Sequence, residues 1–300
     1  MKNLRFVFLL VIGLSFAFYS CTSDDGAIDP QTQNDDDSNP LAAVTFLDVS
    51  YGNNPQQVYD IYLPEGRSIS KTKVLVLIHG GGWTAGDKSD MDDFIDLIQE
   101  SHPNHAIVNI NYVLAALPAT PAFPNQFLDV ESVLQKLTDE KELLQILPEF
   151  GLIGTSAGAH LALMYDYVYD TTDQVKMVCD IVGPSDFTDP FYTNDPNFDI
   201  LLSLLVDESA YPNGGNLAEL TSPVHQVSAA SSPSILFYGN QDPLVPLTNG
   251  QRLNMALSDA MVDHNFTVYE GGHGDDWSPT NILDLQAQIR AFIDLHLPIL

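Results

Sequence analysis

A serine placed between a buried strand and a helix constrains this chain more than any other feature. The sequence Gly154-Thr155-Ser156-Ala157-Gly158 follows the apolar run Phe150–Ile153 and opens a helical pattern over Ala157–Val168. In so sharp a turn the backbone lies close to itself, so a side chain at Gly154 or Gly158 would clash and glycine is required. Strand, turn and helix in this order predict that Ser156 is presented as a nucleophile, whereas the alternative is an ordinary Gly/Ser turn.

A serine nucleophile needs hydrogen-bond donors for the negative oxygen that forms during the reaction. The apolar run Val74–Ile78 is typical of a parallel strand buried on both faces, and it leads directly into His79-Gly80-Gly81-Gly82-Trp83. Glycines let backbone N–H groups approach a ligand without an intervening side chain. We therefore predict an oxyanion hole made by the N–H groups of Gly81, Gly82 and Ala157. A phosphate loop is disfavoured because the Gly-Lys-Ser/Thr ending is missing.

The carboxylate that orients the base is expected just after a later strand. Asp242 follows the strand-like run Ser234–Tyr238 and lies in a turn sequence with two prolines. Asp186 and Asp189, which follow the apolar run Met177–Val182, are the alternatives. Asp242 is favoured because it comes after the next strand and lies nearer the expected base.

The general base is expected to be a histidine near the C-terminus, since it comes last in the chain order of this motif. His273 lies in a glycine-rich loop directly after Asn265–Tyr269, whose alternation predicts the last strand. Histidine titrates nearest to neutral pH, as general-base catalysis requires. Three other candidates fit less well: His264 precedes that strand, His296 lies in the terminal helix, and His160 lies one turn into the helix after the serine. We therefore predict a triad of Ser156, Asp242 and His273.

These motifs resemble those of α/β-hydrolase-fold carboxylesterases and lipases. The likeness covers about residue 43 to the C-terminus and is greatest to the bacterial esterase group with His-Gly-Gly-Gly-Trp, Gly-Asp-Lys and Gly-x-Ser-Ala-Gly-x-His. Here these are His79–Trp83, Gly86-Asp87-Lys88 and Gly154–His160. Some members of that group are described as feruloyl or acetyl esterases. The chain departs from hormone-sensitive-lipase-like esterases at Thr155 and at Gly158-Ala159, where those enzymes usually carry Asp and Gly-Gly; this leaves the triad unaffected.

Strand-like and helix-like runs alternate over residues 43–300, which predicts an α/β fold with a mostly parallel sheet covered by helices on both faces. The resemblance implies an eight-stranded sheet of the α/β-hydrolase type. The expected strands are 44–49, 58–63, 74–78, 106–112, 150–153, 175–182, 234–238 and 265–269. The expected helices are 91–101, 125–137, 157–168, 250–261 and 282–295. The catalytic motifs all follow strands, as expected for a site at the carboxyl ends of a parallel sheet.

The segment from about 186 to 227 breaks this alternation and is expected to be a small cap insertion. It is rich in aromatic residues and contains the apolar, helix-like run Ile200–Val206. We interpret it as a wall or lid of the substrate pocket rather than a surface excursion with a small cluster of its own. Trp83, Phe191 and Tyr192 are the candidate pocket residues, and Phe123 is a further one.

The first 20 residues form a signal peptide pattern, with basic Lys2 and Arg5 before an apolar run. This segment resembles a bacterial lipoprotein signal with Cys21 as the lipidated residue; an ordinary secretory signal is the alternative. Residues 21–42 are polar and acidic and predict a disordered tether. The sequence therefore predicts an exported protein, anchored to a membrane only through lipid, in the outer membrane or at the cell surface.

The formal net charge is −29, with 40 acidic and 11 basic residues. Such acidity disfavours nucleic acid as a partner because of repulsion from phosphates. Cys179 lies within an apolar run and is expected to be buried and free. The oligomeric state cannot be read from the sequence.

No Cys/His cluster, His-Glu-x-x-His or Gly-x-Gly-x-x-Gly pattern is present, so neither a metal nor a cofactor is expected. The predicted function is a serine carboxylesterase acting on short-chain or small aromatic acyl esters, with a small-molecule or glycan-linked ester as substrate. The alternatives are a feruloyl or acetyl esterase of plant polysaccharide, an amide or formamide hydrolase, and a surface binding protein with a vestigial hydrolase fold.

Overall fold

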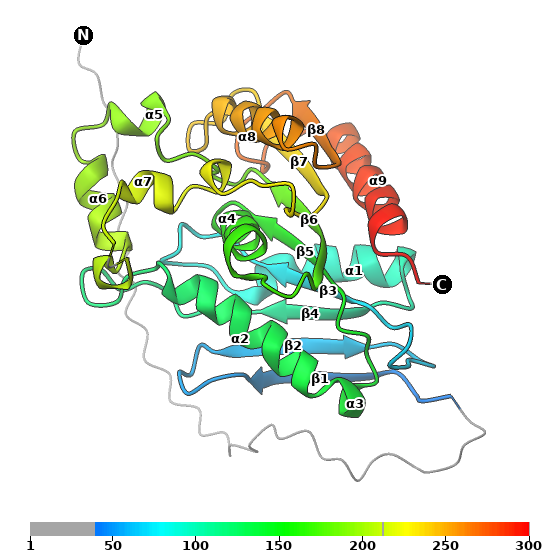
Figure 1. Ribbon diagram of the computed structural model, residues 1–300. Coiled ribbons are helices and arrows are strands. Elements are labelled where there is room, and N and C mark those ends of the chain that lie inside the picture. The colour runs from blue at the N-terminus through cyan, green and yellow to red at the C-terminus, as the bar shows by residue number, and fades with distance from the viewer. Residues whose placement is uncertain (1–39, 212, 300) are drawn as a thin grey trace, which may run out of the picture.

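An eight-stranded sheet forms the centre of the molecule in the computed structural model, which describes residues 40–211 and 213–299 (Figure 1). The predicted signal segment, Cys21 and most of the predicted tether lie outside the described residues. The strands are β1 (Val44–Ser50), β2 (Val58–Leu63), β3 (Val74–Ile78), β4 (Ala106–Ile110), β5 (Phe150–Thr155), β6 (Val175–Ile181), β7 (Ser234–Gly239) and β8 (His264–Tyr269).

The sheet has the order β1-β2-β4-β3-β5-β6-β7-β8. Strand β2 is antiparallel to both β1 and β4, whereas every other neighbouring pair is parallel. The central strands are continuous apolar runs because both of their faces are covered, and all five residues of β3 and of β4 are buried. The prediction of a mostly parallel sheet of the α/β-hydrolase type is therefore confirmed.

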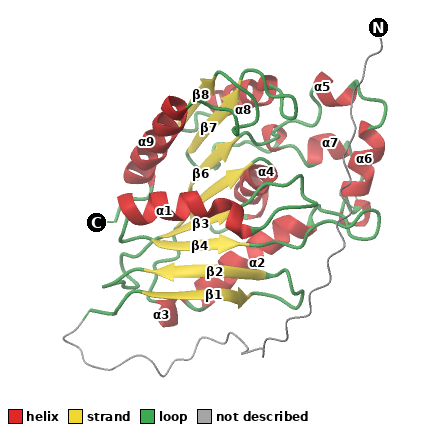
Figure 2. Ribbon diagram, turned by 180° about the vertical axis from the view of Figure 1, so that it is seen from behind, coloured by secondary structure: helices red, strands yellow, loops and turns green. Residues whose placement is uncertain are grey.

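Helices cover both faces of the sheet. The helices are α1 (Asp92–Ser101), α2 (Asn125–Asp139), α3 (Lys141–Leu144), α4 (Ala157–Met164), α5 (Pro190–Thr193), α6 (Phe198–Leu205), α7 (Leu217–Leu220), α8 (Leu247–Asp259) and α9 (Pro279–His296). Figure 1 shows α2 and α4 in front of the strands, and Figure 2 shows α1 on the opposite face. Two hydrophobic clusters result, one beneath α2, α4 and α8 and one beneath α1 and α9.

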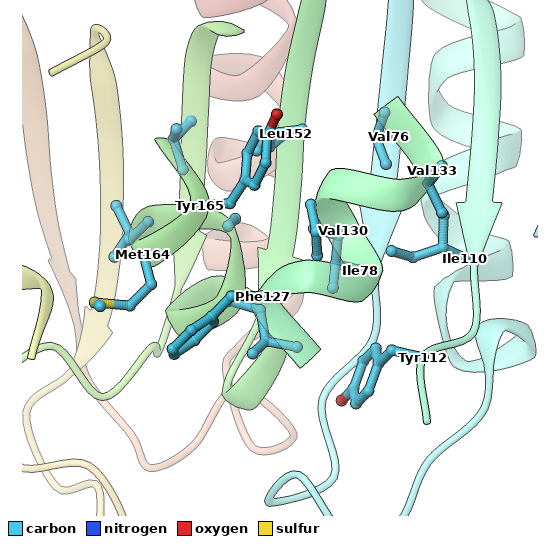
Figure 3. Close-up of a cluster of buried hydrophobic side chains, with 14 of the residues drawn as sticks. Val76, Ile78, Ile110, Tyr112, Phe127, Val130, Val133, Leu152, Met164 and Tyr165 are labelled. Atoms are coloured by element: carbon cyan, nitrogen blue, oxygen red, sulfur yellow. The ribbon is translucent and has the colours of Figure 1, made fainter. Parts of the chain in front are cut away.

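The first cluster is drawn in Figure 3, where Phe127, Val130 and Val133 of α2 lie beside apolar side chains of the strands. These three residues recur at helical spacing, so one stripe of α2 faces the sheet. Helix α4 differs, because all eight of its residues are buried and all of them except His160 are apolar or glycine. Complete burial of a Val, Leu, Ile or Phe contributes about 1.5–3 kcal/mol. Helix α4, which directly follows Ser156, is thus held by packing around its whole circumference.

The predicted cap segment contains the short helices α5, α6 and α7, which Figure 1 shows together at one side of the molecule. Backbone hydrogen bonds join it to the loop after β4: the N–H of Phe123 donates to Leu205, and that of Asp207 donates to Phe123. On α6, Leu202 and Leu205 are buried, whereas Ile200, Leu201 and Leu204 are exposed. Helix α6 therefore packs against the domain along one face only.

Several element ends differ from the sequence prediction. The helix after the serine was expected to reach Val168, but α4 ends at Met164 and continues as a π-helical turn over Tyr165–Tyr169. Helix α8 begins at Leu247, three residues earlier than expected, directly after Pro246. Helix α9 also starts earlier, because Ser278 caps it and Pro279 occupies its first turn. The side-chain cap of Ser278 explains the earlier start of α9.

Candidate active site

The turn between β5 and α4 holds Ser156 in a strained backbone conformation, with φ of 51° and ψ of −117°. A Cβ at Gly154 would meet backbone atoms of Gly158 and Ala159, and a Cβ at Gly158 would overlap the carbonyl oxygens of Ile78 and His79. The steric requirement for both glycines is therefore confirmed. Strain of this kind persists only where the surrounding packing imposes it, and here the buried helix α4 does so.

Three side chains from distant parts of the chain meet at this turn. The Nε2 atom of His273 lies 2.9 Å from the hydroxyl oxygen of Ser156, and its Nδ1 atom lies 2.6 Å from Oδ2 of Asp242. Because an ionised carboxylate only accepts, Nδ1 carries the proton and Nε2 is left to accept from the serine hydroxyl. This is the tautomer that a general base requires.

Asp242 is held rigidly in the loop after β7. Its side chain is completely buried, and its second oxygen, Oδ1, accepts hydrogen bonds from the N–H groups of Leu244 at 2.8 Å and Val245 at 3.0 Å. The loop of His273 is likewise held from within, since Asp276 accepts from the N–H of Gly272 at 2.7 Å. The imidazole is thus oriented before any substrate arrives.

The alternative acids have other partners. Asp186 forms an ion pair with Arg252 and accepts from the backbone of Thr188. Asp189 caps helix α5 by accepting from the N–H of Phe191 at 2.8 Å. Asp186 therefore anchors the start of the cap segment to α8, and Asp189 fixes the first turn of α5.

The glycine-rich loop after β3 lies against the serine, since a Cβ at Gly80 would come within 3.2 Å of the Cβ of Ser156. Gly81 and Gly82 have φ of 113° and 57°, which favour glycine. In the part of the chain that the structure describes, the N–H groups of Gly81, Gly82 and Ala157 donate to no protein acceptor. They are therefore available to a developing oxyanion.

His79 holds this loop in place. Its Nδ1 lies 2.6 Å from the carbonyl oxygen of Gly80, and its ring stacks on Tyr112 with centroids 4.3 Å apart. The hydroxyl of Tyr112 donates to the carbonyl of His79 at 3.0 Å. Burial lowers the pKa of His79, which keeps the ring neutral.

The motif Gly86-Asp87-Lys88 also supports the loop rather than the reaction. Asp87 caps a short 3-10 helix over Lys88–Met91. The ammonium group of Lys88 lies 2.8 Å from Asp48 of β1 and 3.1 Å from Asp60 of β2. These contacts join the end of the glycine-rich loop to the antiparallel part of the sheet.

The sequence interpretation missed the role of His160 in this region. The indole N–H of Trp83 lies 3.3 Å from Nδ1 of His160, and Nε2 of His160 lies 2.8 Å from the carbonyl oxygen of Thr221. Trp83 directly follows Gly81 and Gly82, and Thr221 belongs to the predicted cap segment. His160 is fully buried, and this burial lowers its pKa to about 4. A neutral histidine thus connects the glycine-rich loop, the nucleophile helix and the cap.

A cavity of about 340 Å³ opens at Ser156 and His273. It runs between α1 and α9, where Phe94, Leu97 and Leu285 line it. The three predicted pocket residues lie outside this cavity. Trp83 packs edge-on against Phe123 and Phe187, Tyr192 stacks on Phe198, and Phe191 is 44% exposed on the cap. Their contact with substrate stays a prediction.

Among residues 40–211 and 213–299, no group of three His, Cys, Asp or Glu side chains is arranged to hold a metal ion. Cys179 is buried and free, as expected, and burial raises the pKa of its thiol well above the usual range. None of the described helices is both long and apolar enough to cross a membrane.

The strand order, the serine at the tight turn after β5 and the loops at the strand ends define an α/β hydrolase. A BD-FAE family model matches residues 59–257, a range that includes Ser156 and Asp242 and ends before His273. The chain therefore belongs to the BD-FAE family.

Three known proteins resemble the chain at 17–22% sequence identity. Esterase LipC of Mycobacterium tuberculosis is 22% identical over 250 residues, which are 76% of this chain and 59% of LipC. A carbohydrate esterase from gut microbiota superposes with a TM-score of 0.66 at 18% identity, covering 83% of this chain and 97% of that one. Butyrate-bound esterase 2 of Thermogutta terrifontis gives 0.67 at 17% identity, covering 86% and 95%. The two structures show the shared fold, and the chain spans less than two thirds of LipC.

Proposed function

We propose that this protein is a serine carboxylesterase that hydrolyses short-chain or small aromatic acyl esters. The observation that carries the proposal is the hydrogen-bonded chain from Ser156 through His273 to Asp242, with distances of 2.9 and 2.6 Å. Membership of the BD-FAE family and the likeness to esterase LipC support it.

In the proposed reaction, the hydroxyl oxygen of Ser156 attacks the ester carbonyl carbon while its proton passes to Nε2 of His273. The carbonyl oxygen becomes negative and accepts hydrogen bonds from the free N–H groups of the oxyanion loop and of Ala157. As the carbon–oxygen bond to the alcohol breaks, His273 returns the proton to the leaving oxygen. Water then attacks the acyl-enzyme, His273 takes its proton, and the acid leaves as the serine hydroxyl is restored.

Asp242 orients the imidazole and stabilises its charged form, because the buried carboxylate faces the protonated Nδ1 atom. Loss of a single oxyanion donor typically lowers the rate by about 10²–10³. The strained backbone at Ser156 and the rigid loop of Asp242 keep these groups aligned, which supplies the preorganisation that such catalysis needs.

The first test is Ser156→Ala. Hydrolysis of p-nitrophenyl acetate should fall by a factor on the order of 10⁵–10⁶, because the nucleophile is absent. The variant should keep its melting temperature and should lose labelling by a fluorophosphonate probe. An unchanged rate would refute the proposal, and a wild-type protein that the probe does not label would favour a binding protein with a vestigial hydrolase fold.

A feruloyl or acetyl esterase acting on plant polysaccharide is the second candidate. The resemblance to esterases of that kind favours it, as does the structural likeness to a protein named as a carbohydrate esterase. The geometry of the triad serves an amide or formamide equally well. A panel of acetyl, butyryl, longer acyl and feruloyl esters, with matched amides and acetylated xylan, separates these substrates by their kcat/KM values.

We also propose that the protein is exported and anchored through a lipid on Cys21, with residues 21–42 as an acidic tether. The sequence pattern of the first 42 residues supports this proposal. Cys21→Ser should then move the protein from the membrane fraction to the soluble fraction. Wild-type protein found in the soluble fraction would contradict it.

A further inference from the structure

We propose that the cavity between α1 and α9 binds the alcohol half of the ester, and that this alcohol is small, uncharged and apolar or aromatic. The inference rests on the proposed esterase function and narrows it. It assigns the leaving-group side of the site, which the proposed function leaves open.

The cavity is part of the reaction centre, because Ser156 and His273 both lie in its wall. The strand ends on either side also contribute, through Thr155 of β5 and Ile181 of β6. Its volume of about 340 Å³ lies near the lower end of the range of about 300–1,000 Å³ for ligand pockets. The space therefore suits one ring or a short alkyl chain.

The position of His273 decides which half of the ester enters. In the tetrahedral intermediate the negative oxygen faces Gly81, Gly82 and Ala157, and none of these three lines the cavity. The leaving oxygen must come within hydrogen-bond reach of Nε2 of His273, because it receives the proton from there. His273 lies in the cavity wall together with Trp277 from the same loop, so the leaving group lies on the cavity side.

The part of the cavity wall beside His273 is fixed by a hydrogen bond and by burial. The indole N–H of Trp277 donates to the carbonyl of Gly272 at 3.2 Å, and Trp277 is 6% exposed. This contact joins the wall of the cavity to the residue before the base. A leaving group packed on Trp277 would therefore be placed relative to Nε2 by a rigid surface.

The chemistry of the lining selects the alcohol. Most of the wall is apolar, with Phe94 and Leu97 from α1 facing Ile282 and Leu285 from α9. A sugar bound there would find side-chain hydrogen-bond partners outside the triad only at Asp93, Thr155 and Gln286. Hydroxyl groups that reach none of these would be left unpaired, each at a cost of about 1–3 kcal/mol. Asp93 also lines the cavity, and the chain has a formal net charge of −29, so an anionic alcohol is disfavoured.

The test changes the cavity wall at two half-buried positions outside the triad. Phe94→Ala enlarges the cavity and Ile282→Phe fills part of it. Leu283→Phe is the matched control, because Leu283 is the next residue of α9 and is 66% exposed. Melting temperatures establish that each variant is folded.

Two substrate series are compared, one of acetate esters with methyl, benzyl and naphthyl alcohols and one of p-nitrophenyl esters with acetyl, butyryl and hexanoyl groups. We expect Ile282→Phe to lower kcat/KM for naphthyl relative to methyl acetate by about tenfold or more, and Phe94→Ala to shift that ratio the other way. The ratios within the acyl series, and the deacylation rate constant of the acetyl-enzyme, should stay at wild-type values in both variants and in the control.

A change confined to the acyl series would overturn the inference, because it would place the acyl half in the cavity. Ratios that stay unchanged in both series would also overturn it, since the cavity would then hold neither half. In both cases wild-type hydrolysis and labelling of Ser156 would leave the esterase proposal standing. If the wild-type protein neither hydrolyses these esters nor reacts with the fluorophosphonate, the proposed function itself fails.

Discussion

The buried carboxylate of Asp242 fixes both the shape of its own loop and the tautomer of His273. Its Oδ2 atom faces Nδ1 of His273 at 2.6 Å, while Oδ1 is occupied by two backbone N–H groups. The loop therefore keeps its shape through one oxygen, and the histidine keeps its tautomer through the other. The two roles can be separated experimentally.

Asp242→Asn should lower kcat for p-nitrophenyl acetate by about 10⁴, because an amide in place of the carboxylate favours the wrong tautomer of His273. The remaining carbonyl oxygen can still accept from Leu244 and Val245, so the melting temperature should change little. Asp186→Asn is the control, since it removes the ion pair with Arg252 and should leave kcat within a few-fold of wild type. A loss of less than tenfold in Asp242→Asn would assign the orienting role to another group.

His160 belongs to the sequence motif around the serine, yet its function follows from contacts that no local pattern reveals. Trp83 is 77 residues away from it in sequence, and Thr221 is 61 residues away. The sequence marks the histidine only by its position one helical turn after Ser156. Its partners are determined by the packing of the cap and of the loop after β3 around α4.

At the scale of elements, the contact between α4 and β3 decides the geometry of the turn. The backbone of Gly158 lies directly against the carbonyl groups of Ile78, the last residue of β3, and of His79, which follows it. A helix that approaches a strand this closely can carry no side chain at the contact. The same approach brings the start of α4 to the glycine-rich loop, so one contact places both groups of N–H donors that are proposed to bind the oxyanion.

Gly158→Ala should therefore lower the free energy of unfolding by about 3 kcal/mol or more, because its methyl group must displace backbone rather than a flexible side chain. Urea denaturation measures the change. Gly214→Ala is the control: a Cβ there meets nothing within 4 Å, and its φ of 65° predicts a loss of only about 1–2 kcal/mol. Equal losses in the two variants would show that the contact with β3 is not the cause.

The cavity between α1 and α9 also results from the way in which secondary-structure elements are arranged. The two helices follow β3 and β8, which lie on opposite sides of β5 in the sheet. Leu97 of α1 and Leu285 of α9 are buried against the sheet. The space left between them at the level of Ser156 depends on how the helices pack, which no hydrophobic pattern specifies.

At the scale of the whole molecule, two buried carboxyl groups make stability depend on pH. Burial raises the pKa of Asp166 to about 7 and that of Asp180 to about 7, although hydrogen bonds from Ser232, Tyr238 and Gly183 oppose the shift. Between about pH 4 and 7 the folded chain holds protons at these sites that the unfolded chain has released. Both groups therefore lower the free energy of unfolding as pH rises through this window.

Buried His160 acts in the opposite direction. Its pKa of about 4 in the folded state means that the unfolded chain binds a proton below about pH 6.5 that the folded chain does not. This histidine therefore lowers stability as pH falls. The pH dependence of the wild-type protein is the sum of these opposing contributions, so a single group is best examined by substitution.

Asp180→Asn should remove one of the contributions that fall with rising pH. The free energy of unfolding should then decrease less, or increase more, than in wild type between pH 4 and 7. The amide can still accept from Gly183 or from the hydroxyl of Tyr238, so the fold should persist. Urea denaturation across this range measures the difference, with exposed Asp259→Asn as the control. Parallel curves for Asp180→Asn and wild type would contradict the expected ionisation of Asp180.

The sequence by itself determined the succession of strands and helices, the strand-turn-helix around Ser156 and the residue types of the candidate triad. These properties depend on local patterns: apolar runs, glycines where side chains would clash, and polar residues directly after strands. Only the tertiary structure brought Ser156 within 2.9 Å of a histidine that is 117 residues away. It also paired Asp186 with Arg252 in an ion pair and placed the cavity between α1 and α9. The physical reason is that such contacts depend on the order of strands in the sheet and on the packing of side chains from distant segments, which no stretch of sequence specifies alone.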